Sequence, residues 1–260
     1  MPQLRWLKGN LHTHTTNSDG DTEPEHVAEW YHEHAYDFLV LSDHNHLTIL
    51  DAGPEEKARW PLLIPGEEVT AAFEERPVHI GGIGVGHLVE PQTGDSVADT
   101  IQRNVQAVRA VGGLPTINHP NYKWAIGERD IAAVEGAWGL EVYNGHHRTN
   151  DAGGGGQPGT LALWDRLLSR GKRIFGVAVD DAHHFHGEFG PRRANPGRGW
   201  VMVEAEDASE NALLAAMSEG RFYGSSGVTL AEVHARGGEL AISIEPEDDY
   251  TYTTVFTGRY

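Results

Sequence analysis

Short apolar runs that end in polar residues recur along the chain, and this recurrence is the feature that most constrains its fold. Residues 38–41 (FLVL) are followed at once by SDH, and residues 174–179 (IFGVAV) run into DDAH. Continuous apolar runs of this length are typical of strands that are buried on both faces. Segments with the apolar spacing of helices, such as residues 96–111 and 160–170, lie between such runs. The alternation predicts parallel strand–helix units.

A length of 260 residues suits one large unit of this type. In a barrel of parallel strands, the residues just after the strands gather at one end, where such folds build their active sites. His79 is an exception, because it lies inside an expected strand. The tail alternates like a β-hairpin with Gly237 and Gly238 at its turn. We therefore expect a barrel over residues 1–228 and a short β-rich extension over residues 229–260.

Composition and charge exclude several classes of protein. The absence of cysteine excludes disulfides and thiolate zinc sites, and leaves His, Asp and Glu as possible metal ligands. A net charge of −18 argues against binding long nucleic acid through a broad basic face. No apolar run is long enough for a membrane-spanning helix, and the first ten residues lack the apolar region of a signal peptide. We expect a cytoplasmic protein without a membrane partner.

The segment NLHTHTTNSDG, residues 10–20, combines several metal-binding side chains. His12 and His14 are two residues apart, so on a strand they point to the same face. Neutral imidazole is the commonest metal ligand in proteins. Asp19 can reach the same pocket because Gly20 lets the backbone turn. An isolated H-x-H is explained equally well by an ordinary surface loop, so the rest of the chain decides.

Further motifs of the same kind follow in a defined order. They are HTH (12–14), SDG (18–20), SDH (42–44), PGEE (65–68), His79, NHP (118–120) and DAH (181–183). In these motifs the chain resembles the PHP (polymerase and histidinol phosphatase) metallohydrolases, a branch of the amidohydrolase-like barrels. Residues 220–227 (GRFYGSSG) are most similar to the CehA-like subgroup. The resemblance implies a distorted (β/α)7 barrel that holds two to three divalent transition metals.

The resemblance also implies a ligand set, position by position. The first metal is expected at His12, His14, Glu68 and Asp181, the second at Glu68 as a bridge with His79 and His119, and the third at Asp19, His44 and His183. Of these, Glu68, Asp181 and His183 are also expected to be catalytic. Nitrogen and oxygen ligands in this mixture suit Zn²⁺, Mn²⁺ or Fe²⁺ and do not select one of them.

Two pairs of neighbouring carboxylates leave the register open. Glu67 and Glu68 compete for one role, and the family pattern favours Glu68, which stands immediately before an apolar residue. Asp180 and Asp181 compete likewise, and the D-x-H spacing favours Asp181. Asp43 is expected to orient a ligand histidine, which is a common role for a carboxylate near a metal.

The expected activity is hydrolysis of a small anionic phosphoester, such as a nucleotide. Divalent metals lower the pKa of bound water from about 15.7 to about 7, and the resulting hydroxide can attack phosphorus while the ions stabilise the other oxygens. Arg148, Lys123 and Arg192 follow expected strands and are candidates to bind the phosphate, although each one alone is explained equally well as a solvated loop cation. One of the loop histidines could donate a proton to the leaving group. These loop histidines are His146, His147, His184 and His186.

Three other functions compete with this one. The same metals could hydrolyse a carboxyl or carbamate ester, as the CehA-like resemblance suggests. The chain could also be a metal-binding regulatory barrel without activity, although the complete ligand set argues against it. A polymerase proofreading module is disfavoured by the acidic charge. The sequence does not determine the oligomeric state.

Overall fold

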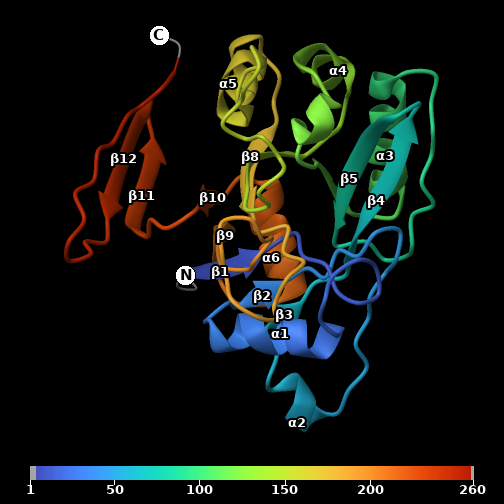
Figure 1. The fold of residues 1–260 in the computed structure, drawn as a ribbon. Helices are drawn as coiled ribbons and strands as arrows, with labels where there is room; N and C mark the ends of the chain where they lie inside the picture. Colours follow the sequence, from blue (N-terminus) through green and yellow to red (C-terminus); the bar gives the residue numbers. More distant parts are fainter. Residues whose placement is uncertain (1–3, 259–260) are drawn as a thin grey trace.

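Two five-stranded sheets form the centre of the protein, as the computed structural model of residues 4–258 shows (Figure 1). In the first sheet the strand order is β10–β9–β1–β2–β3. Its strands are β1 (Arg5–Asn10), β2 (Phe38–Leu39), β3 (Leu62–Leu63), β9 (Trp200–Ala205) and β10 (Phe222–Ser225). Strands β1, β2 and β3 are parallel, whereas β9 runs antiparallel to both of its neighbours.

The second sheet has the order β4–β5–β6–β7–β8. Its strands are β4 (Gly66–Phe73), β5 (Arg76–Ile83), β6 (Leu114–Ile117), β7 (Gly139–Asn144) and β8 (Phe175–Val179). Strands β6, β7 and β8 are parallel, but β4 and β5 form an antiparallel hairpin that Glu74 helps to turn with a φ of 53°. The prediction of parallel units throughout is therefore wrong for β5, which follows a tight turn and runs antiparallel to both β4 and β6, and for β9.

The two sheets are not joined into a closed barrel by strand pairing within residues 4–258. Two isolated parallel bridges connect them, Thr13 with Ala182 and His44 with Glu68. Each bridge joins the segment that follows a strand of the first sheet to a segment of the second sheet. The mixed α/β architecture is as predicted. The bridges also bring together the segments that carry the predicted metal ligands.

Several helices pack against strands of the two sheets (Figure 1). The helices are α1 (Pro24–Glu33), α2 (Pro54–Lys57), α3 (Val97–Ala110), α4 (Glu128–Ala133), α5 (Thr160–Ser169), α6 (Glu210–Ser218) and the 3-10 helix η1 (Tyr122–Trp124). In α3, Ser96 caps the N-terminus and Ile101, Val105 and Val108 are fully buried. Each such side chain stabilises the fold by about 1.5–3 kcal/mol. No helix in the described part of the chain is long and apolar enough to cross a membrane.

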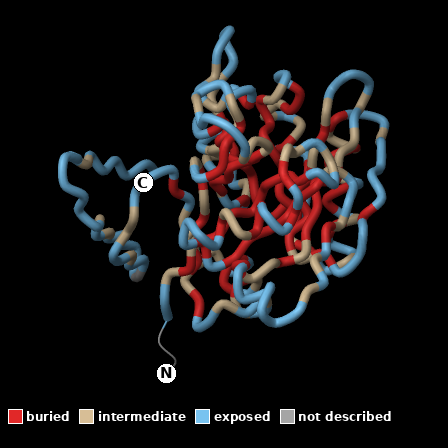
Figure 2. Tube along the Cα trace, turned by 60° about the horizontal axis from the view of Figure 1, so that its bottom comes forward, coloured by how far each residue is buried: buried red, intermediate tan, exposed pale blue. Residues whose placement is uncertain are grey.

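A β-hairpin follows β10 and stands apart from the body in Figures 1 and 2. It consists of β11 (Leu230–Arg236) and β12 (Glu239–Ile244). Gly237 and Gly238 form its turn with φ values of 62° and 85°, which confirms the predicted turn. The predicted barrel begins at residue 1 and the predicted extension ends at residue 260. Residues 1–3 and 259–260 lie outside the described residues.

Candidate metal centre

The side chains predicted as metal ligands come from both sheets and converge on one site. Most of them lie just beyond the ends of parallel strands. They converge because the two sheets bring those strand ends together. His12 and His14 follow β1, His44 follows β2, His119 follows β6, and Asp181 and His183 follow β8, whereas Glu68 and His79 lie within β4 and β5. Asp19 reaches the site from the loop after β1.

These side chains form four overlapping groups in which the ligand atoms lie within 4.8 Å of one another. The groups are His14, Asp19, His44 and His183; His12, Glu68 and His119; His12, His14 and Asp181; and His44, Glu68 and His79. Every predicted ligand is present in at least one group. The division differs from the one that the resemblance implies, since His14 also joins the Asp19 group and His79 lies with His44. Ligand roles within these groups remain predictions.

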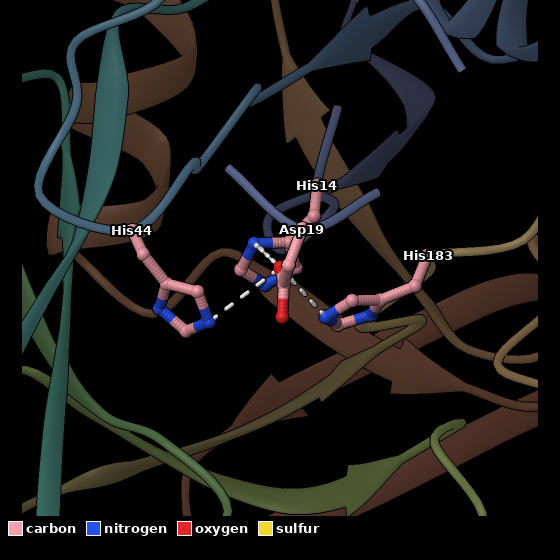
Figure 3. A group of neighbouring side chains, drawn as sticks. All are labelled: His14, Asp19, His44 and His183. Carbon is pink, nitrogen blue, oxygen red and sulfur yellow. Dashed lines mark ion pairs between the residues drawn. The ribbon is translucent and has the colours of Figure 1, made fainter. Parts of the chain in front are cut away.

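In the first group, three imidazoles surround one carboxylate (Figure 3). Oδ1 of Asp19 lies 3.2 Å from Nε2 of His183, 3.6 Å from Nδ1 of His14 and 3.7 Å from Nε2 of His44. Partial burial by itself would raise the pKa of Asp19, but His183 and His44 outweigh it and lower that pKa. The carboxylate is therefore ionised at neutral pH and available to a cation.

Glu68 is the centre of the buried groups and is inaccessible to solvent. Its Oε1 lies 3.0 Å from Nε2 of His119 and 3.1 Å from Nδ1 of His79. Its Oε2 lies 2.9 Å from Nδ1 of His44 and has no hydrogen-bond partner among the residues that the structure describes. Burial alone would raise the pKa of Glu68, but His79 and His12 hold it well below its ordinary value. An ionised carboxylate with an unsatisfied buried oxygen is suited to bridge two cations.

The orientation of His12 tests whether a metal fits this site. Its Nδ1 lies 2.7 Å from Oε1 of Glu141 and donates to it, so a neutral ring presents the lone pair of Nε2 to the site. That Nε2 lies 3.0 Å from Nε2 of His14, 3.4 Å from Asp181 and 3.5 Å from Glu68. Burial lowers the pKa of His12, but Asp181 and Glu68 raise it well above its ordinary value, so the site attracts positive charge. Divalent cations satisfy such converging lone pairs, and the residues fit them.

The structure separates the two competing glutamates. Glu68 points into the cluster, whereas Glu67 points to the opposite face of β4, where its Oε1 accepts a hydrogen bond of 2.6 Å from the backbone of Val89. Its other oxygen is buried without a hydrogen-bond partner among the described residues. Burial raises the pKa of Glu67 to about 7.

The competing aspartates are separated in the same way. Asp181 lies in the cluster, 3.3 Å from Nε2 of His14. Asp180 instead anchors the loop after β8, since it accepts hydrogen bonds of 2.6–2.9 Å from the backbone of three consecutive residues and one of 2.8 Å from the hydroxyl of Tyr31. The backbone donors are Gly197, Arg198 and Gly199.

Asp43 reaches a predicted ligand histidine through another side chain. Its carboxylate accepts hydrogen bonds from the backbone and hydroxyl of Thr15 (both 2.8 Å) and from the hydroxyls of Ser18 and Thr48 (both 2.6 Å). The Ser18 hydroxyl also lies 3.3 Å from Nδ1 of His14, whereas no hydrogen bond joins Asp43 directly to a histidine ring within residues 4–258. Asp43 therefore holds the loop that carries His14 and Asp19, and its expected role in orienting a histidine would act through Ser18.

Glu141 is a functional residue that the sequence did not reveal. It is 1% exposed, and its carboxylate accepts from Nδ1 of His12 (2.7 Å), the backbone of His119 (2.7 Å) and the amide of Asn144 (2.8 Å). It thereby orients the ring of His12 and holds the backbone of His119, two predicted ligands that follow β1 and β6. The available signal was a single carboxylate within the apolar run of residues 140–143 (LEVY).

We predict that Glu141→Ala weakens metal binding by a factor of about 10–100, because His12 loses the acceptor that orients it. Glu141→Gln keeps one acceptor oxygen and should lose less. Competition with a chromogenic chelator measures the affinity. Equal metal affinity in Glu141→Ala and the unchanged protein would contradict a role for Glu141 in orienting the ligands.

A cavity of about 510 Å³ opens above the metal-ligand groups. Besides those groups it is lined by Tyr122, Thr149, the loop histidines His146, His147 and His184, and the arginines Arg148, Arg192 and Arg193. The side chains of Arg148 and Arg192 form no ion pair with the described part of the chain. Lys123 does not line this cavity; its ammonium group lies 5.2 Å from the ring centroid of Tyr122.

Known proteins share parts of this sequence and this fold, although no family model matches the chain. The chain is 30% identical over 209 residues to the 5′-3′ exoribonuclease Rnm of Salmonella typhimurium (strain LT2), an alignment that covers 73% of this chain and 65% of that enzyme. The structure resembles a two-domain protein of Bacteroides vulgatus that contains a predicted PHP-like metal-dependent phosphoesterase, with a TM-score of 0.59, 17% identity, and 93% and 76% of the two chains covered. It also resembles the lesion-specific endonuclease PfuEndoQ of Pyrococcus furiosus, with a TM-score of 0.50, 14% identity, and 83% and 56% covered.

The chain therefore shares its fold with a protein that contains a predicted PHP-like metal-dependent phosphoesterase and with a lesion-specific endonuclease. Its site gathers the His, Asp and Glu side chains that could hold metal ions.

Proposed function

We propose that the protein hydrolyses phosphoesters with the help of two to three divalent metals held by the predicted ligands. The observation that carries this proposal is the position of three arginines, Arg148, Arg192 and Arg193, on the same cavity as the metal-ligand groups. Arginine forms paired hydrogen bonds with phosphate oxygens. We also propose that the two sheets are the halves of a distorted (β/α)7 barrel over residues 1–228, which the extension follows. Within the PHP metallohydrolases, we propose that the protein is most similar to the CehA-like subgroup.

The roles of the residues follow from their places. Divalent cations at these ligands would activate water and neutralise charge on the phosphoryl oxygens. Glu68, Asp181 and His183 would hold the cations in place, and Glu141 keeps His12 oriented. Arg148 and Arg192 would bind the phosphate at the mouth of the cavity. Burial of Glu68 strengthens its interactions with cations, since fewer water molecules screen them.

The cavity volume suits a small molecule or the end of a longer one. Binding cavities for small ligands measure about 300–1,000 Å³, so a nucleotide fits whole. The two nucleases named above make the end of a nucleic acid strand a second candidate substrate. The net charge of −18 weighs against a long strand only through the acidic groups that the strand would approach, because charges more than about 8 Å from a phosphate are largely screened at physiological salt. We favour the small phosphoester because it needs no contact with the acidic surface beyond the cavity.

The arginines also weigh against the alternative of carboxyl or carbamate ester hydrolysis. A neutral ester gathers negative charge on one oxygen during attack, whereas a phosphoester carries charge on several oxygens from the start. Arg148 and Arg192, which form no ion pair within the described residues, match the second distribution better, whereas Arg193 lies 3.6 Å from Asp21.

A substrate panel tests the proposed function. We expect the metal-loaded protein to hydrolyse p-nitrophenyl phosphate, its diester, mononucleotides or short 5′-phosphorylated RNA, and to lose this activity in chelator and regain it with Mn²⁺ or Zn²⁺. Asp181→Asn, purified in the same way, controls for contaminating phosphatases. A fully metallated protein that cleaves aryl carbamates or carboxyl esters but no phosphoester would overturn the proposal.

A further inference from the structure

The histidines around the cavity differ in which ring nitrogen they present to it. In His12, Nδ1 donates to Glu141, and in His183, Nδ1 lies 2.9 Å from the backbone oxygen of Asp181 and donates to it. A neutral ring whose Nδ1 carries the hydrogen has its lone pair on Nε2. Both rings therefore present an acceptor to the site, as a metal ligand must.

His146 has the opposite arrangement. Its Nδ1 accepts a hydrogen bond of 3.2 Å from the backbone N–H of Arg148. Because that nitrogen is occupied by a donor, the hydrogen of the neutral ring must be on Nε2. Within residues 4–258, Nε2 of His146 has no hydrogen-bond partner. His146 thus presents an N–H donor where the predicted ligands present lone pairs.

The position of His146 brings this donor to the substrate region. The half-buried ring lines the cavity and packs edge-on against the ring of His183, with 5.4 Å between the centroids. The backbone of His146 is fixed as well, because its N–H donates to Oδ1 of Asn144 at 2.8 Å. Nδ1 of His184 likewise accepts a backbone hydrogen bond, from Ala194 at 3.2 Å, but the ring of His184 lies farther from that of His183, with 6.4 Å between the centroids. Of the two donors, His146 is the nearer to His183.

We propose that His146 is a catalytic residue that donates its Nε2–H to an oxygen of the bound phosphate group and binds no metal. This inference rests on the proposed function for its substrate class. Donors fixed in advance stabilise the charge that develops on phosphoryl oxygens, because they need not reorient during the reaction. The hydrogen bond requires no proton transfer, so the ring remains neutral throughout.

Two substitutions separate the donor from the loop that holds it. His146→Asn keeps an oxygen that can accept the N–H of Arg148, as asparagine does in Asx turns, but removes the donor at the position of Nε2. His146→Gln retains an N–H donor of longer reach. His87 is the control, because it is an exposed loop histidine that does not line the cavity.

The measurements are kcat/KM for an aryl phosphoester, metal content, and binding of inorganic phosphate by calorimetry on the metal-loaded protein. We expect His146→Asn to lower kcat/KM by a factor of about 100 and to weaken phosphate binding about tenfold, with unchanged metal content. His146→Gln should recover at least a tenth of the activity, and His87→Asn should stay within about threefold of the unchanged protein. His146→Phe provides a second donor-free variant if His146→Asn does not fold.

Unchanged kcat/KM and phosphate affinity in the donor-free variants would overturn the inference, and so would a loss of metal from them. A different result would show that the proposed function is wrong while the role of His146 is right. If the unchanged protein cleaves no phosphoester but binds phosphate more tightly than His146→Asn does, the donor role stands and the reaction class is wrong.

Discussion

Glu68→Gln is expected to release at least one metal and to lower phosphoester hydrolysis by a factor of about 10³, the largest effect of any single substitution that we predict. Glu68 lies in two of the ligand groups, and its carboxylate is within 3.5 Å of four imidazoles, those of His12, His44, His79 and His119. Glutamine keeps the shape but loses the charge. Breaking a buried charge pair costs about 3–5 kcal/mol, and about 4 kcal/mol corresponds to a factor of 10³.

The matched control is Glu67→Gln. Burial raises the pKa of Glu67 to about 7, so near neutral pH much of this group is already uncharged, and glutamine can still accept the N–H of Val89. We expect this variant to keep its metals and to retain activity within about threefold. Elemental analysis and steady-state kinetics measure both variants side by side. The reverse result, with Glu67 essential and Glu68 dispensable, would show that the ligand register is shifted by one residue.

Metal binding is expected to raise the melting temperature by about 10 °C. Glu68 and Asp181 are buried carboxylates that a cation would neutralise, and the unfolded chain offers no preformed site. A ligand at 1,000 times its dissociation constant stabilises the folded state by about 4 kcal/mol. In a protein of about this size, each kcal/mol raises the melting temperature by about 2–4 °C.

Calorimetry of the chelated protein, before and after addition of Zn²⁺ or Mn²⁺, measures this shift. Glu67→Gln should show the full increase and Glu68→Gln only a part of it. A shift below about 2 °C, with at least two equivalents of metal bound, would show that the cluster is equally stable without its cations. In that case the imidazoles alone would compensate the buried carboxylates.

Short-range patterns predicted the parts of the protein that depend on local chemistry. The spacing of His12 and His14 placed both on one face, and the D-x-H spacing singled out Asp181, which lies in the cluster. The Gly237–Gly238 pair marked a turn that only positive φ values allow. In each case the outcome depends on a few neighbouring residues, which the sequence displays directly.

Two features of the fold could not be derived in this way. The short motif PGEE, residues 65–68, does not by itself indicate a strand, but Glu68 lies within β4 and is buried. Its burial is tolerable only because imidazoles from other strand ends surround it. Glu141 gains its role from His12, which is 129 residues away in the chain. No local pattern reports such partners.

The sequence by itself determined which side chains could bind metals and which strand ends carry them. Only the tertiary structure decided how these side chains divide into groups, that Asp43 holds a loop and reaches His14 through Ser18, and that His146 presents a hydrogen where the predicted ligands present lone pairs. The physical reason is that spacing along a strand sets the face to which a side chain points, whereas ligand distances and imidazole tautomers depend on groups that different segments bring to the same place.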